Sequence, residues 1–156
     1  MSTDRGAELA DAHKHPVLVV GVDGSSASWD AFSWLAGEAQ RSNGLMIAVL
    51  VVPLADPATA MCAFFPLAAG AAKVAKEEAA DYLAQETARR AGEIGVEVKF
   101  VLEHGDAAQA LARVARCAHA DLIAVGRSAK RRHRLAGSLG RRLALDGDLP
   151  AVVVVP

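Results

Sequence analysis

The chain has 156 residues, of which 53 % are hydrophobic, and its formal net charge is −1. This composition suffices for the core of a single domain, and the near-zero charge argues against bulk electrostatic binding of nucleic acid. The two cysteines, Cys62 and Cys117, match no metal or redox spacing, so we expect reduced thiols and a cytoplasmic location. Residues 1–15 are polar and lack the apolar core of a signal peptide. We interpret them as a flexible leader before a domain at 16–156.

The first predicted unit is a strand followed by a helix. Residues 16–22 form a short apolar run rich in β-branched side chains, which is typical of a strand buried on both faces. The turn at 23–26 offers serine as an N-cap for a helix that extends to Gln40. Asn43 and Gly44 tolerate left-handed geometry and end that helix.

The second unit contains the stretch that is hardest to place. Leu45–Val52 predicts another buried strand. Residues 53–72 contain three prolines and a single charge, so we expect a loop with at most one short helical turn and no transmembrane helix. The apolar part of this loop, 57–70, would cover a site or contact a protein partner, or else fold onto its own core. An amphipathic helix follows at 73–91, with its charges on a solvated face.

The last units alternate again between strand and helix. Residues 96–102 have one polar face and predict a strand near a sheet edge. Asp106 with Gln109 forms a capping-box pattern that opens a helix at 107–118. His104 and His119 have no Ser, Cys or paired carboxylate at a useful spacing, so we predict structural or solvent roles and no catalytic residue. A strand at 122–125, a helix at 139–145 and a strand at Ala151–Val155 complete the chain.

Five strands alternating with helices predict an α/β fold in which a parallel sheet is covered by helices on both faces. Ligands of such sheets bind beyond the carboxyl ends of the strands, where the strand order reverses. The ends at 22–25 and 125–128 both carry glycine and polar residues, so we expect them to be neighbours at that point. Asp23 would face a sugar hydroxyl, or would only form an Asp turn that caps the first helix.

Residues 125–138 form a predicted loop from a strand end to a helix start, with Gly126 near its beginning and Gly137 near its end. Between Arg127 and Arg142 there are seven Lys or Arg and no acid, which favours an anion and polyphosphate first. The candidate charge partners of the phosphates are Arg127, Lys130 and Arg131. No aromatic residue interleaves with this charge, which argues against nucleic acid. No carboxylate cluster predicts a metal site, so Mg²⁺ is expected only with a nucleotide.

Four blocks of the chain resemble the universal stress protein family in the family's order. They are residues 19–25, 120–126, 137–138 and 149–154, and the resemblance extends from 16 to 155. It implies a five-stranded, Rossmann-like three-layer sandwich of the adenine nucleotide alpha hydrolase-like type. It also implies homodimers joined through the last strand, 151–155. In one branch of the family, it implies ATP or another adenine nucleotide bound without a strong catalytic apparatus.

The resemblance to the ATP-binding branch assigns roles to single residues. Asp23 would contact the ribose or the base edge, and Val52, or its neighbour Val51, would line the adenine pocket. The residues implied beside the ribose and phosphates are Val125, Gly126, Ser128, Ala129, Gly137, Ser138 and Leu139. The phosphate loop is altered, because Ala129 stands where the branch has a second glycine. Only seven residues separate Ala129 from Gly137, where the branch has nine.

Three functions remain open at this point. The first is a nucleotide-binding stress or signalling protein. The second is a member of the same family that has lost its nucleotide and acts as a dimeric interaction module. The third is an enzyme such as a slow ATPase, which the lack of a recognisable base, nucleophile and metal cluster disfavours.

Overall fold

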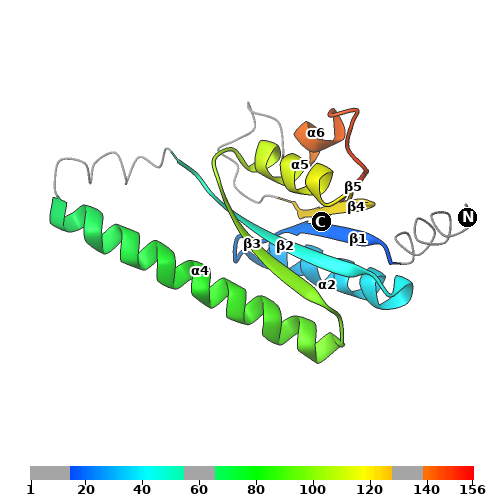
Figure 1. The fold of residues 1–156 in the computed structure, drawn as a ribbon, viewed down its shortest axis with the longest axis horizontal. Coiled ribbons are helices and arrows are strands. Elements are labelled where there is room, and N and C mark those ends of the chain that lie inside the picture. Colours follow the sequence, from blue (N-terminus) through cyan, green and yellow to red (C-terminus); the bar gives the residue numbers. More distant parts are fainter. Residues whose placement is uncertain (1–14, 55–65, 128–138) are drawn as a thin grey trace, which may run out of the picture.

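The computed structural model describes residues 15–54, 66–127 and 139–156 (Figure 1). Within them, strands and helices alternate as the sequence predicts. The elements in chain order are β1 (Val17–Gly21), α2 (Ser26–Ser42), β2 (Leu45–Val52), α4 (Pro66–Ile94), β3 (Val98–His104), α5 (Ala107–Cys117), β4 (Leu122–Gly126), α6 (Leu139–Ala144) and β5 (Ala151–Val155).

The five strands form one parallel sheet in the order β3-β2-β1-β4-β5. Leu18 of β1 pairs with Leu122 of β4, so the two strands are neighbours although two other strands separate them in sequence. The chain therefore builds outward from β1 in one direction, returns, and builds outward in the other. This reversal between β1 and β4 is the predicted switch point, and the predicted fold class is confirmed.

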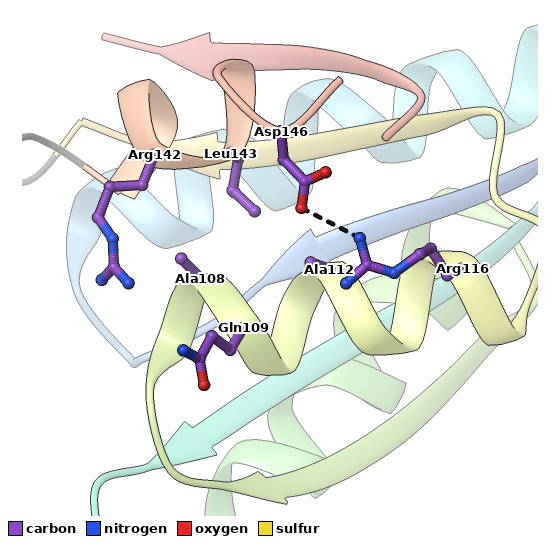
Figure 2. Close-up of a pocket in the computed structure, with 7 residues that line it drawn as sticks. All are labelled: Ala108, Gln109, Ala112, Arg116, Arg142, Leu143 and Asp146. Carbon is purple, nitrogen blue, oxygen red and sulfur yellow. Dashed lines mark hydrogen bonds and ion pairs between the residues drawn. The ribbon is translucent and has the colours of Figure 1, made fainter. Parts of the chain in front are cut away.

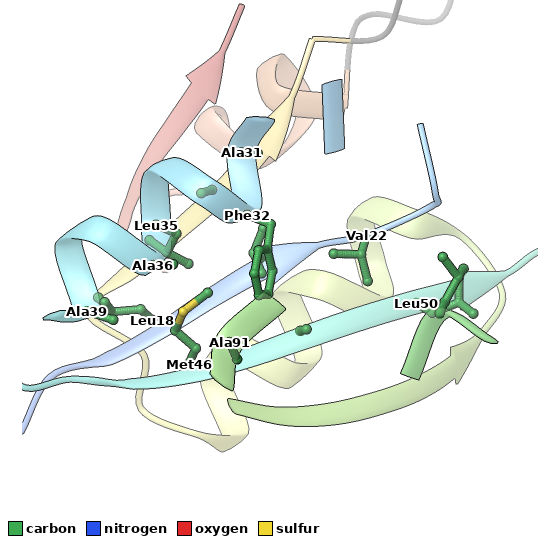
Figure 3. Close-up of a cluster of buried hydrophobic side chains, with 14 of the residues drawn as sticks. Leu18, Val22, Ala31, Phe32, Leu35, Ala36, Ala39, Met46, Leu50 and Ala91 are labelled. Carbon is green, nitrogen blue, oxygen red and sulfur yellow. The ribbon is translucent and has the colours of Figure 1, made fainter. Parts of the chain in front are cut away.

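Two apolar cores lie on the two faces of the sheet. Alternate side chains along a strand point to opposite faces, so Val20 packs with helices α2 and α4 while Val19 packs with α5 and α6. Figure 3 shows the first core, where Phe32 and Leu35 of α2 lie over β1 and β2. Helices thus cover both faces of the sheet. The three layers bury the middle residues of β1 and β4, and both ends of these strands are partly buried.

The predicted caps of the helices are confirmed. The Ser25 hydroxyl accepts a hydrogen bond from the Ser28 N–H at 3.2 Å and caps α2. Asn43 has a left-handed φ of 53°, and the Gly44 N–H donates to the Ala39 carbonyl at 2.8 Å. Asp106 accepts from the Gln109 N–H at 3.0 Å and caps α5.

Several predicted boundaries are wrong, most clearly that of α4. The sequence predicts a loop with at most one helical turn at 66–72, yet α4 begins at Pro66, because proline is tolerated in the first turn and the alanine-rich stretch after it favours helix. The helix also runs through Gly92 to Ile94 and ends at Gly95, whose φ is 81°. β3 consequently starts at Val98, and α2 extends two residues past Gln40 to Ser42. The remainder of the apolar stretch, 55–65, and the leader at 1–14 lie outside the described residues.

The exposed end of α4 projects past the sheet. Among the residues of α4 whose burial is described, the buried ones begin at Ala80 and continue with Leu83, Thr87 and Ala91, at the spacing of one helix face. Figure 1 shows the N-terminal turns of the helix running beyond the strands. β3 lies at the sheet edge next to α4, as its polar face predicts.

Candidate functional site

The carboxyl ends of β1, β2 and β4 meet at one edge of the sheet. Val20 of β1 pairs with Ala124 of β4, and Gly21 of β1 pairs with Val49 of β2. The residues just beyond these pairs include the predicted site residues Asp23, Val52, Val125, Gly126 and Arg127. Val125 is buried, Val52 is partly buried, and Asp23 and Arg127 are exposed. The fold therefore brings these five predicted residues to a single edge.

Leu139 lies near them at the start of α6. It packs against the same apolar cluster that contains Val125 and Leu143. The remaining predicted residues, Ser128, Ala129, Lys130, Arg131, Gly137 and Ser138, lie outside the described residues.

Asp23 forms the Asp turn that was one of its two predicted roles. Its Oδ1 accepts a hydrogen bond from the Ser25 N–H at 2.9 Å, and Gly24 between them has a φ of 82°. The Asp23 N–H in turn donates to the Ser28 hydroxyl at 3.3 Å. These bonds hold the exposed loop against the first turn of α2. A contact of Asp23 with a ribose stays a prediction.

Gly126 has a packing role that the sequence pattern does not reveal. A Cβ placed on it would lie 2.2 Å from the Ala27 carbonyl oxygen and 2.8 Å from the Ser28 nitrogen. The absent side chain is therefore needed for the close approach of α2 to β4. On the side where a side chain would lie, the space beside Gly126 is occupied by the backbone of Ala27 and Ser28.

Gly140 has the same kind of role on the other face. Its Cβ would lie 2.3 Å from Cγ2 of Val154, so the glycine allows α6 to lie directly on β5. Leu143, one turn later, is only 1 % exposed and enters the core beside Ile123. These contacts press the short helix onto β4 and β5.

Arg142 binds Asp106 through two parallel hydrogen bonds. Its Nη1 and Nη2 donate to Oδ2 and Oδ1 of Asp106, each at 2.8 Å. The guanidinium of Arg142, followed by the Gln109 N–H, lowers the pKa of Asp106, and the same hydrogen bonds raise the pKa of Arg142. One of the seven basic residues that favoured an anion is thus already neutralised. Sequence reasoning missed this pair, because its members are 36 residues apart and belong to different helices.

A hollow of about 170 Å³ lies between α5 and α6, and Figure 2 shows its walls. Arg142 is near the first turn of α5, whereas Arg116, near its last turn, binds Asp146 at 3.0 Å. The residues that line the hollow are Ala108, Gln109, Ala112, Arg116, Arg142, Leu143 and Asp146. Both arginines are paired with carboxylates, so this hollow adds no uncompensated charge.

Two further kinds of site were sought in the part of the chain that the structure describes. No three His, Cys, Asp or Glu side chains there lie close enough together to hold a metal ion. None of the described helices is long and apolar enough to cross a membrane. His119 takes a left-handed φ of 49° in the turn after α5.

Comparison with known proteins agrees with the geometry. The model of the universal stress protein family matches residues 16–155, and no curated protein sequence matches the chain. Among solved structures, a universal stress protein in complex with cAMP has 24 % identity and a TM-score of 0.66, covering 91 % of this chain and 97 % of that one.

Two further structures show the same fold. A universal stress protein from Archaeoglobus fulgidus in complex with dAMP has 19 % identity and a TM-score of 0.64, covering 91 % of this chain and 98 % of that one. A family protein from Arabidopsis thaliana with AMP bound has 16 % identity and a TM-score of 0.60, covering 90 % of each chain. The match of the family model to nearly the whole chain, on this sheet order, shows that the chain belongs to the universal stress protein family.

Proposed function

We propose that this chain binds an adenine nucleotide at the carboxyl ends of β1 and β4 and acts in stress response or signalling. The observation that carries the proposal is the pairing of β1 with β4 at the switch point, which brings Asp23 and Arg127 to one edge. The three family structures with cAMP, dAMP and AMP support the ligand class.

In this proposal each of the described residues contacts a different part of the nucleotide. Asp23 contacts the ribose, Val52 lines the adenine pocket, and Arg127 offers charge to the phosphates. Leu139 supplies an apolar wall near the ribose, and Val125 lies in the buried cluster against which Leu139 packs. The other residues of the proposed phosphate site are Gly126, Ser128, Ala129, Lys130, Arg131, Gly137 and Ser138. Mg²⁺ would enter only with a triphosphate.

The proposed action is binding without turnover, in a cytoplasmic homodimer joined through β5. That strand is at a sheet edge and consists of one alanine and four valines, with Val154 45 % exposed. An uncharged edge strand is a template for pairing with a second chain. Sedimentation of the purified protein at several concentrations tests the dimer separately from the ligand.

The ligand is tested by denaturing the purified protein and identifying released small molecules by mass spectrometry. A second arm measures the unfolding temperature and calorimetric binding with ATP, AMP and cAMP, with and without Mg²⁺. We expect adenine nucleotide in the first arm or an upward shift in the second. No released nucleotide together with no shift at millimolar ATP and Mg²⁺ would overturn the proposal.

The runner-up is a nucleotide-free dimeric interaction module. It is favoured by two exposed side chains of α4: Val74 in the projecting turns is 53 % exposed, and Tyr82 farther along the helix is 65 % exposed. The partner surface would include these turns and the apolar stretch at 57–70, of which 57–65 lie outside the described residues. Loss of a protein partner on Val74→Lys or Tyr82→Lys, in a chain that binds no nucleotide, would establish this alternative.

A further inference from the structure

The position of α6 is set by contacts with the rest of the fold. The helix has six residues, which is too short to be stable alone in water. Three residues of the helix hold it in place: Gly140 lies on β5, Leu143 enters the core, and Arg142 binds Asp106. Each of these contacts is to a different part of the molecule, so together they define where the helix lies.

The contact of Arg142 is with a residue just beyond the carboxyl end of a strand, Asp106 after β3. Arg142 follows Leu139 by three residues and therefore shares a helix face with it. Asp106 comes two residues after His104, the last residue of β3, so it lies at the carboxyl edge of the sheet. The ion pair thus connects the first turn of α6 to the same edge that carries Asp23 and Gly126.

The geometry of this pair restricts α6 more than a single contact would. Both carboxylate oxygens of Asp106 bind Arg142, and Oδ1 also accepts from the Gln109 N–H, so the carboxylate is itself held by α5. A planar guanidinium bound at two nitrogens has its orientation fixed as well as its distance. By contrast, Arg116 is bound to Asp146 by one hydrogen bond of 3.0 Å.

We propose that Asp106 and Arg142 are positioning residues of the nucleotide site. Their ion pair holds α6 in the place where the first turn of this helix contacts the ligand. The inference rests on the proposed function. Neither residue needs to touch the nucleotide, because the charge of Arg142 is already compensated by Asp106. The competing idea is that Arg142 leaves Asp106 and binds a phosphate directly.

Isothermal calorimetry with AMP and ATP distinguishes these two roles, because they predict opposite changes in nucleotide affinity for the variant Asp106→Asn. Asp106→Asn keeps a good N-cap for α5 and removes the charge that holds Arg142. If the pair positions α6, Asp106→Asn and Arg142→Gln each weaken binding about threefold to tenfold, by the coupling expected through a packed element. The double variant is then no weaker than the worse single variant, because both remove the same interaction. If Arg142 binds phosphate, Asp106→Asn frees it and tightens binding, which overturns the proposal.

The matched control is Arg116→Gln, which breaks the other ion pair between the two helical regions. Arg116 is ten residues along α5 from Asp106, about 15 Å from the carboxyl edge, so its loss should change affinity less than about twofold. Arg142→Lys retains the charge but not the two parallel bonds, and we expect an intermediate loss; this variant serves if Arg142→Gln does not fold. Unchanged affinity in Asp106→Asn and Arg142→Gln overturns this inference alone. No binding by the unaltered chain overturns it together with the proposed function.

Discussion

The Ala27 carbonyl oxygen occupies the place where a side chain on Gly126 would begin, 2.2 Å from the position of its Cβ. Ala27 is in the first turn of α2 and Gly126 is the last residue of β4. The contact therefore joins the helix after β1 to the strand beside β1. It fixes how closely α2 approaches β4.

The first prediction concerns this contact. Gly126→Ala should destabilise the protein by about 2 kcal/mol or more, because a backbone carbonyl cannot move aside as a flexible side chain can. Urea denaturation measures the change. Gly92→Ala is the matched control: it lies inside α4 with nothing within 4 Å of its Cβ position, so it should stabilise by about 0.5–1 kcal/mol. Equal stability of the two variants would contradict the close packing.

A second prediction concerns a buried hydroxyl on α4. Thr87 is 0 % exposed, and its Oγ1 has no hydrogen-bond partner among the described residues. Thr87→Val keeps the shape and removes the polar atom, so it should raise the free energy of unfolding by about 1 kcal/mol. Thr87→Ser keeps the hydroxyl and removes a methyl group, and should lower it. Destabilisation by valine would show that the hydroxyl has a partner.

A third prediction concerns the cap of α2. Ser25→Ala removes the hydroxyl that accepts from the Ser28 N–H and should cost about 1 kcal/mol of stability. Ser26→Ala, one residue into the helix, is the control and should change stability little. Thermal unfolding of the two variants measures the difference. If Ser25→Ala lowers the stability no more than Ser26→Ala does, Ser25 does not cap the helix.

A fourth prediction follows from an ion-pair cluster on α4. Hydrogen bonds from Arg89 and then Arg90 lower the pKa of Glu86 from 4.5 to about 2. Because the folded pKa is the lower one, the stabilisation is present above about pH 4.5 and is lost as the pH falls toward 2. Arg90 also lies over the Trp29 ring at 4.3 Å, which connects the cluster to α2.

Glu86→Gln should therefore flatten the decline of the unfolding temperature between pH 4.5 and pH 2 relative to the unaltered chain. Glu78→Gln, on the projecting turns of α4, serves as the control. The measurement is the unfolding midpoint across that range of pH. If the unfolding midpoint falls equally between pH 4.5 and pH 2 in the Glu86 variant and the unaltered chain, the ion pairs with Arg89 and Arg90 do not stabilise the fold.

The sequence by itself determined the alternation of strands and helices, the parallel sheet and the family. β2 and β5 begin and end at their predicted residues, because runs of β-branched side chains are a local signal. The caps at Ser25 and Asp106 were also predictable, since each contact spans three residues. The start of α4 at Pro66 was not, because proline breaks a helix in its interior but is favourable in its first turn, and the sequence pattern does not show which position Pro66 has.

The tertiary structure alone decided what Gly126, Gly140 and Arg142 do. In the sequence, Gly126 and Arg142 appear as parts of a phosphate loop and its basic cluster. In the fold, Gly126 makes room for α2, Gly140 makes room for Val154, and Arg142 is paired with Asp106. The physical reason is that a close approach or an ion pair between elements depends on how those elements pack. Local propensity and periodicity act within one element and do not specify which atoms of other elements will contact a given residue.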